Sequence, residues 1–93
     1  MYNQLIILNF THHNQAGFGL SFKRDSLFYL PIKAFNNAIW IDELHFWWIV
    51  DNQESRFFLR QLFEQFENVQ YFIRIGKRNY PLPIWYGKVP VLQ

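Results

Sequence analysis

The side chains in this sequence that could carry out chemistry are three histidines, a few hydroxyls and several carboxylates. His12 and His13 are adjacent in a polar stretch, and His45 precedes a run of aromatic residues. Adjacent histidines can share a metal ion, but a protein zinc site needs three or four ligands. No histidine lies two or four residues from another. We therefore expect solvated side chains at His12 and His13, a partly buried structural role for His45, and no metal or other cofactor.

Motifs for covalent or phosphate chemistry are also scarce. No serine lies in a Gly-X-Ser-X-Gly elbow, and the glycines in 17–19 lack the third glycine of a phosphate-binding loop. One enzyme hypothesis stays open, a small ribonuclease-type toxin. It would use His12 or His13 as the base and Arg74 or Lys77 to hold the phosphate. We expect a protein that is not an enzyme, and we assign no catalytic residue.

The segment 74–80 combines cations with an aromatic ring. It contains Arg74, Lys77, Arg78 and Tyr80, and residues 68–93 hold four cations and no acid. Residues 42–67, by contrast, hold six acids against two arginines. Cations beside stacking rings are typical of surfaces that bind single-stranded nucleic acid. A nucleic-acid-binding module that uses these four residues is therefore the alternative functional hypothesis.

Aromatic residues are the most unusual feature, since they make up 22% of the sequence. Trp47 and Trp48 are adjacent, and successive side chains on a strand point to opposite faces of the sheet. Either both faces are covered at this strand, or one face presents bulky apolar groups to a partner. Both tryptophans are therefore candidate partner-binding residues.

A second candidate surface lies on a helix expected over residues 52–68. Its apolar stripe is formed by Phe58, Leu59, Leu62, Phe66 and Val69, with Phe63 at the edge. Phe57 falls on the opposite, polar side, together with Arg60 and Glu64. These three residues complete the predicted partner-binding set.

The elements that must position these residues define an α+β fold. We expect one domain over 1–93, with a mainly antiparallel sheet of four to six strands, the long helix at 52–68 and a short helix at about 31–40. Strands are expected at 5–10, 18–22, 27–30, 44–50, 71–75 and 80–86, with loops at 11–17 and 76–79. Asp51 and Glu54 have capping-box spacing. Pro81 and Pro83 require an edge position for the last strand, because proline cannot donate to a ladder.

The whole pattern favours binding over catalysis. No apolar run reaches the ~18 residues that a membrane span requires, and the first residues lack the basic start of a signal peptide. We expect a cytoplasmic, non-catalytic protein-interaction domain that makes no membrane contact. A small inhibitor, immunity or accessory protein that blocks a partner's surface has this profile, for example an anti-CRISPR protein from a phage or mobile element. A homodimer that buries the remaining aromatic face is a further alternative.

The helical phase yields a prediction for Phe57. Phe57→Ala should leave the melting temperature nearly unchanged, because the apolar stripe is complete without this ring. It should weaken binding to the partner, or to a second copy, by about tenfold or more if Phe57 is an interface anchor. Thermal unfolding followed by circular dichroism measures the first effect. A large loss of stability in the isolated monomer would contradict the predicted phase.

Overall fold

A computed structural model describes residues 4–66 and 69–82. The elements in chain order are β1 (Gln4–His12), β2 (Gln15–Ser21), α1 (Tyr29–Ala34), β3 (Ile39–Ile41), β4 (Phe46–Val50), α2 (Gln53–Gln65), β5 (Gln70–Ile75) and β6 (Arg78–Leu82). The strands form one sheet of order β3-β4-β2-β1-β5-β6, in which β1 and β5 pair in parallel and all other pairs are antiparallel. The predicted α+β class, with one long and one short helix, is confirmed.

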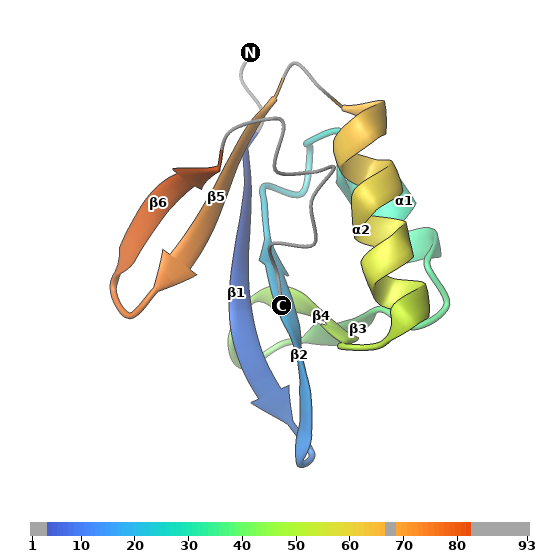
Figure 1. Ribbon diagram of the computed structural model, residues 1–93, viewed down its shortest axis with the longest axis vertical. Helices are drawn as coiled ribbons and strands as arrows, with labels where there is room; N and C mark the ends of the chain where they lie inside the picture. The colour runs from blue at the N-terminus through green and yellow to red at the C-terminus, as the bar shows by residue number, and fades with distance from the viewer. Residues whose placement is uncertain (1–3, 67–68, 83–93) are drawn as a thin grey trace.

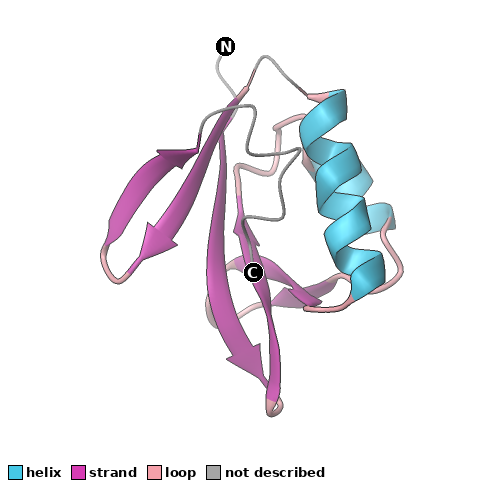
Figure 2. Cartoon of the chain, in the orientation of Figure 1, coloured by secondary structure: helices cyan, strands magenta, loops and turns pink. Residues whose placement is uncertain are grey.

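The sheet has an apolar cluster on each face. Both helices lie on the same side of it (Figures 1 and 2). The helix-side cluster consists of Leu5, Ile7, Phe18, Leu20, Phe28, Ile32, Ile49, Leu59, Leu62, Phe63 and Tyr71. The far-face cluster consists of Ile41, Phe46 and Trp48, with Leu8, Phe10 and Val50 packed against it. Alternate residues of β1 and β4 supply the two clusters, as the two-residue period of a strand requires.

Glycines in β2 make room for the far-face cluster. A Cβ at Gly17 would overlap the Trp48 indole and the carbonyl oxygen of Ile49. A Cβ at Gly19 would lie 3.0 Å from the Phe46 ring. The absence of side chains here lets large rings on β4 lie directly over the β2 backbone, so this cluster closes without a helix.

The predicted hairpin of β1 and β2 is confirmed, but its loop is shorter than the expected 11–17. Thr11 pairs with Ala16, and His12 pairs with Gln15. Only His13 and Asn14 form the turn, with φ of 51° and 64°. Two positive φ angles define the tight turn that suits the right-handed twist of paired strands. The predicted loop was based on the polar composition of residues 11–17. These residues are polar because this end of the β1–β2 ladder extends beyond the apolar clusters.

The region between β2 and β4 differs most from the sequence-based expectation. The predicted strand at 27–30 is wrong, because this segment forms turns and then the first residues of α1. The helix predicted at 31–40 ends at Ala34, since Phe35 is extended with ψ of 123°. Residues 39–41 are instead strand β3, in which Trp40 pairs with Trp47 and Ile41 pairs with Phe46. Cross-strand pairing of these large side chains outweighs the weak local helical pattern.

The predicted strand at 44–50 begins later, because residues 42–45 form a turn. Two amides of this turn, those of Leu44 and His45, donate to the carbonyl oxygen of Ile41. His45 is exposed and has φ of 59°, so the expected partly buried position within a strand is wrong. Histidine tolerates this left-handed conformation better than the β-branched residues that follow.

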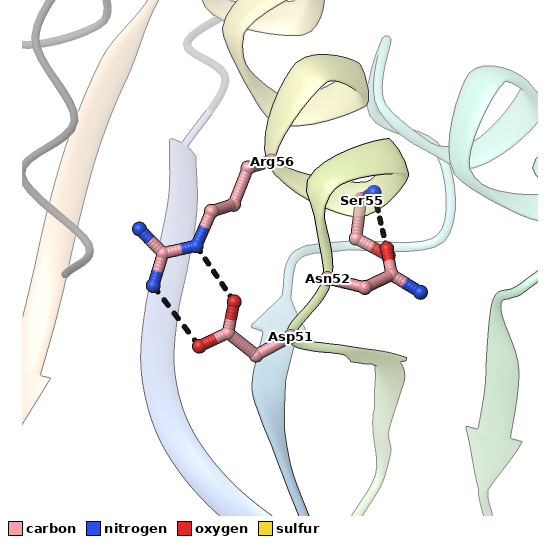
Figure 3. A network of polar contacts seen from close by, with 4 residues as sticks. All are labelled: Asp51, Asn52, Ser55 and Arg56. Carbon is pink, nitrogen blue, oxygen red and sulfur yellow. Dashed lines mark hydrogen bonds and ion pairs between the residues drawn. The ribbon is translucent and has the colours of Figure 1, made fainter.

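Helix α2 begins one residue later than the proposed capping box implies. Asn52, not Asp51, is the N-cap: its Oδ1 accepts a 2.8 Å hydrogen bond from the Ser55 amide (Figure 3). Asp51 instead accepts two hydrogen bonds from Arg56, at 2.7 Å to Nε and 3.0 Å to Nη2 (Figure 3). These bonds hold the pKa of the Asp51 carboxyl below its ordinary value. The ion pair therefore links the end of β4 to the first turn of the helix.

The last turn of α2 is tied to β5. The helix ends at Gln65, and Phe66 is its C-cap. The expected extension to 68 is therefore wrong at residue 66. Residues 67–68 lie outside the described residues. The buried Tyr71 hydroxyl donates a 2.6 Å hydrogen bond to the Phe66 carbonyl. Burial raises the pKa of this hydroxyl, which keeps it protonated as a donor.

At the other edge of the sheet, β6 occupies the position expected from its proline. Pro81 pairs with Phe72 on one side, and among residues 4–66 and 69–82 no strand pairs with it on the other. The turn before β6 is Gly76-Lys77, shorter than the expected 76–79, and Gly76 has φ of 63°. Residues 83–86 of the predicted last strand, Pro83 included, lie outside the described residues.

The phase of α2 can be tested with two adjacent substitutions. Leu62 is buried in the helix-side cluster, whereas Gln61 is exposed. Leu62→Ala should lower the free energy of unfolding by about 2–5 kcal/mol, because it leaves a cavity. Gln61→Ala should change it by less than about 0.5 kcal/mol. Urea titrations of both variants measure the difference, and equal losses would mean that the helix is rotated.

Candidate functional site

The structure places the helical members of the predicted partner-binding set on the outer face of α2. Phe57 is 58% exposed, and Arg60 and Glu64 are exposed beside it. Residues three and four apart are neighbours on a helix surface, so these side chains form one strip. The predicted orientation of Phe57 is confirmed. The strip has a single aromatic ring, and one exposed phenylalanine is common on protein surfaces.

The two tryptophans lie on opposite faces, as expected. Trp48 is only 3% exposed, and its Nε1 donates a 2.8 Å hydrogen bond to the carbonyl oxygen of Phe10. It therefore presents little surface to a partner. Trp47 is half-buried on the other face, where it packs against the helix-side cluster. The face of this strand that carries Trp48 is therefore covered, whereas Trp47 on the other face stays partly exposed.

The basic segment 74–80 is divided between the two faces of the β5–β6 hairpin. Arg74 pairs across the ladder with Asn79, and its Nε donates to the Asn79 Oδ1 at 2.9 Å. Arg78 and Tyr80 lie on the opposite face of the hairpin, and Lys77 is in the turn. All of these except Arg74 are exposed. The ring and one cation are thus brought together, but Arg74 is directed to the other face.

The residues of the ribonuclease hypothesis do not form one site. His12 is at the tip of the β1–β2 hairpin, where its ring centroid is 4.1 Å from that of His13. Lys77 is at the tip of β5–β6, and the two tips project separately (Figure 1). Arg74 pairs with Leu8, four residues before His12, or about 13 Å along the strand. Among residues 4–66 and 69–82, no three metal-binding side chains gather either.

A pocket of about 440 Å³ lies elsewhere, between α1 and the β3–β4 hairpin. It is lined by four aromatic residues and three basic ones, namely Phe22, Tyr29, Trp40 and Trp47 with Arg24, Lys33 and His45. We call this the aromatic–basic pocket. Its volume is in the range of ~300–1,000 Å³ typical of ligand sites. Only Trp47 belonged to the predicted set.

Regular elements position most of the lining. Trp40 and Trp47 are directly opposite in the β3–β4 ladder, with ring centroids 5.6 Å apart and planes at 59°. Tyr29 and Lys33 are one turn apart on α1, and the Lys33 Nζ is 5.3 Å from the centroid of the Tyr29 ring. Side chains four residues apart share one face of a helix. The pocket is therefore walled by a strand pair on one side and a helix face on the other.

The charges of the lining are all of one sign. Arg24 and Lys33 are exposed, and within the described chain neither forms an ion pair. Asp42 is outside the lining, and its Oδ1 accepts a 3.2 Å hydrogen bond from the Trp40 Nε1. Within the described chain it forms no ion pair with Arg24 or Lys33. The pocket thus offers donors that an anionic group could use.

Exposed apolar side chains gather on the same two segments. Leu30 is 73% exposed and Trp40 is 41% exposed, and Leu27, Ile39 and Leu44 are also exposed. All five lie within 27–30 or 39–44, and the other exposed large hydrophobic residues of the described chain are Phe57, Ile75 and Tyr80. We call Leu27, Leu30 and Leu44 the apolar rim, whereas Ile39 pairs with Trp48 and so lies on the far face of the sheet. Large apolar groups beside a pocket are typical of interaction sites.

Sequence reasoning misses most of this site. The helix predicted at 31–40 includes Trp40 and so separates it from Trp47, and no local pattern in the sequence sets Arg24 and Lys33 apart. The usable signal was the pair of tryptophans in 40–47, separated by a turn-forming stretch that begins with Asp42 and Glu43.

Comparison of the chain with protein-family models, curated proteins and solved structures finds no match. Over residues 4–66 and 69–82, neither helix is long and apolar enough to cross a bilayer. The pocket and the exposed apolar side chains are therefore the features that bear on function.

The nucleic-acid alternative has a direct test at the β5–β6 hairpin. If phosphates are bound there, Lys77→Ala with Arg78→Ala should weaken binding to a single-stranded DNA or RNA pool. The slope of log affinity against log salt should fall by roughly two units, because two phosphate contacts are lost. Fluorescence anisotropy over a salt series measures this. Failure of the unsubstituted protein to bind either pool at micromolar concentration and low salt would remove the alternative.

Proposed function

We propose that this chain is a non-catalytic domain that binds another protein through the aromatic–basic pocket and its apolar rim. The observation that carries the proposal is the coincidence of the two features on the same segments. Of the eight exposed large hydrophobic residues of the described chain, Trp40 lines the pocket, and Leu27, Leu30 and Leu44 are within two residues of lining residues in the sequence.

The residue types favour a protein partner over nucleic acid. Tryptophan, tyrosine and arginine dominate binding energy at protein interfaces, and Trp40, Tyr29 and Arg24 all line the pocket. Leu30 and Leu44 on the rim are aliphatic and exposed. Such groups gain little from a phosphate backbone, and nucleic-acid interfaces are more polar than protein–protein interfaces.

The lining also supports binding rather than catalysis. Of the side chains that line the pocket, only His45 is of the type that most often serves as a general acid or base in enzymes. The lining holds no serine, threonine or carboxylate that could serve as a nucleophile or orient the imidazole. A small inhibitor, immunity or accessory protein needs only such a surface, because it acts by covering part of its partner.

Photo-crosslinking in cells of the source organism tests this proposal. A photo-reactive phenylalanine analogue is placed singly at Leu30, at Leu44 and, as a control, at Asn79 on the distant β5–β6 hairpin. We expect adducts with the same protein from the first two positions and none from Asn79. Trp40→Ala should reduce the adduct yield by at least about tenfold, since a central aromatic anchor is worth 2 kcal/mol or more.

The same experiment separates the competing surfaces. The analogue at Phe57 reports on the outer face of α2. Adducts from Phe57 but not from Leu30 or Leu44 would contradict the proposed surface and favour the strip with Arg60 and Glu64. Adducts with a second copy of the chain would instead support the homodimer hypothesis. Mass spectrometry identifies the adduct in each case.

A further inference from the structure

We infer that the aromatic–basic pocket selects an acidic segment of the partner, in which an aromatic side chain enters the pocket beside a carboxylate. This inference rests on the proposed function and names the chemistry of its partner. The aromatic side chains of the lining favour an aromatic guest, and the basic side chains favour a carboxylate beside it.

The aromatic lining favours an aromatic guest. Trp40 and Trp47 are tilted by 59° and so present both a ring face and a ring edge. Tyr29 contributes a third ring from α1, with Lys33 over it at 5.3 Å. Aromatic pairs prefer offset-stacked or edge-to-face arrangements, which a guest ring can form with these walls. A volume of about 440 Å³ admits such a ring together with part of a neighbouring residue, but not a whole helix or strand.

The cations favour a guest that also brings acceptors. Arg24 and Lys33 carry only donors and are exposed, so they keep water when an apolar guest enters the pocket. A carboxylate next to the guest ring can accept a charge-assisted hydrogen bond from these cations, which an apolar guest cannot do. The cations therefore favour a guest that also carries an acid.

Among residues 4–66 and 69–82, no acid forms an ion pair with Arg24 or Lys33. Asp25, Asp42 and Glu43 lie outside the lining of the pocket. A nucleotide shares the chemistry of a planar ring with an anion. The exposed leucines of the rim favour the peptide, because they can cover the apolar parts of a segment on either side of the guest ring.

Synthetic peptides test the inference without knowledge of the partner. The probe is a fluorescein-labelled peptide with Phe flanked by Asp and Glu in a Gly-Ser background, titrated with the full chain. Its matched counterpart carries Asn and Gln in place of the acids. We expect saturable binding of the acidic peptide below about 1 mM. The neutral peptide, and an acidic peptide with Ala in place of Phe, should each bind at least about tenfold more weakly.

Charge variants locate the contact. Arg24→Gln with Lys33→Gln should weaken the acidic peptide by roughly tenfold and leave the neutral peptide unchanged. Lys77→Gln with Arg78→Gln removes the same charge from the β5–β6 hairpin and should change neither affinity by more than about twofold. Melting temperatures of both variants should equal that of the parent, because all four cations are exposed.

Three results would overturn the inference. They are equal binding of acidic and neutral peptides, no binding of any peptide, and tighter binding of a single-stranded oligonucleotide that competes at the same residues. The crosslinking experiment distinguishes failure of this inference from failure of the proposed function. Adducts at Leu30 and Leu44 that persist in the Arg24→Gln, Lys33→Gln variant would keep the protein partner and reject its acidic character.

Discussion

The packing of the Trp48 indole onto the glycine backbone of β2 is the contact on which the rest of the fold depends. Gly17 and Gly19 have no side chains, so the rings of Trp48 and Phe46 lie directly against the β2 backbone. The indole N–H is satisfied by the Phe10 carbonyl, and no buried donor is lost. This cluster forms without a contribution from either helix, and both helices lie on the other face of the sheet. The alternation of β4 then fixes Trp47 on the helix side, at the boundary between the core and the pocket.

The position of the pocket follows from how little α1 buries. This helix has six residues, and only Ile32 is fully buried, while Phe28 precedes it in the core. A short helix anchored at these points holds its remaining face over the β3–β4 hairpin without filling the space between them. Tyr29 and Lys33 are on that face, opposite the tryptophan pair. Four of the seven lining residues are thus held by a strand pair and a helix, which position side chains more firmly than loops do, while Phe22, Arg24 and His45 come from loops and turns.

The fold also redistributes the charges. Along the chain the cations are concentrated at 68–93 and the acids at 42–67. In space, Arg56 pairs with Asp51, and Arg74 is directed toward Asn79 and away from Arg78. Arg24 and Lys33, which belong to no conspicuous run, are the cations that converge on a concave surface. Charge density along a sequence is therefore a poor guide here, since recognition depends on which groups share a cavity.

Local physical chemistry was sufficient for part of this protein. The two-residue period of 46–50 determined that Trp47 and Trp48 point apart, the helical period determined that Phe57 faces outward, and the missing amide of Pro81 determined an edge strand. Each of these follows from backbone geometry within a few residues. The strand order, the assignment of 39–41 to a strand and the pocket were decided only by tertiary structure. They depend on Trp40 pairing with Trp47 and on α1 packing beside that pair. Such contacts join segments whose own propensities are weak, and they are stabilised only when the whole sheet has formed.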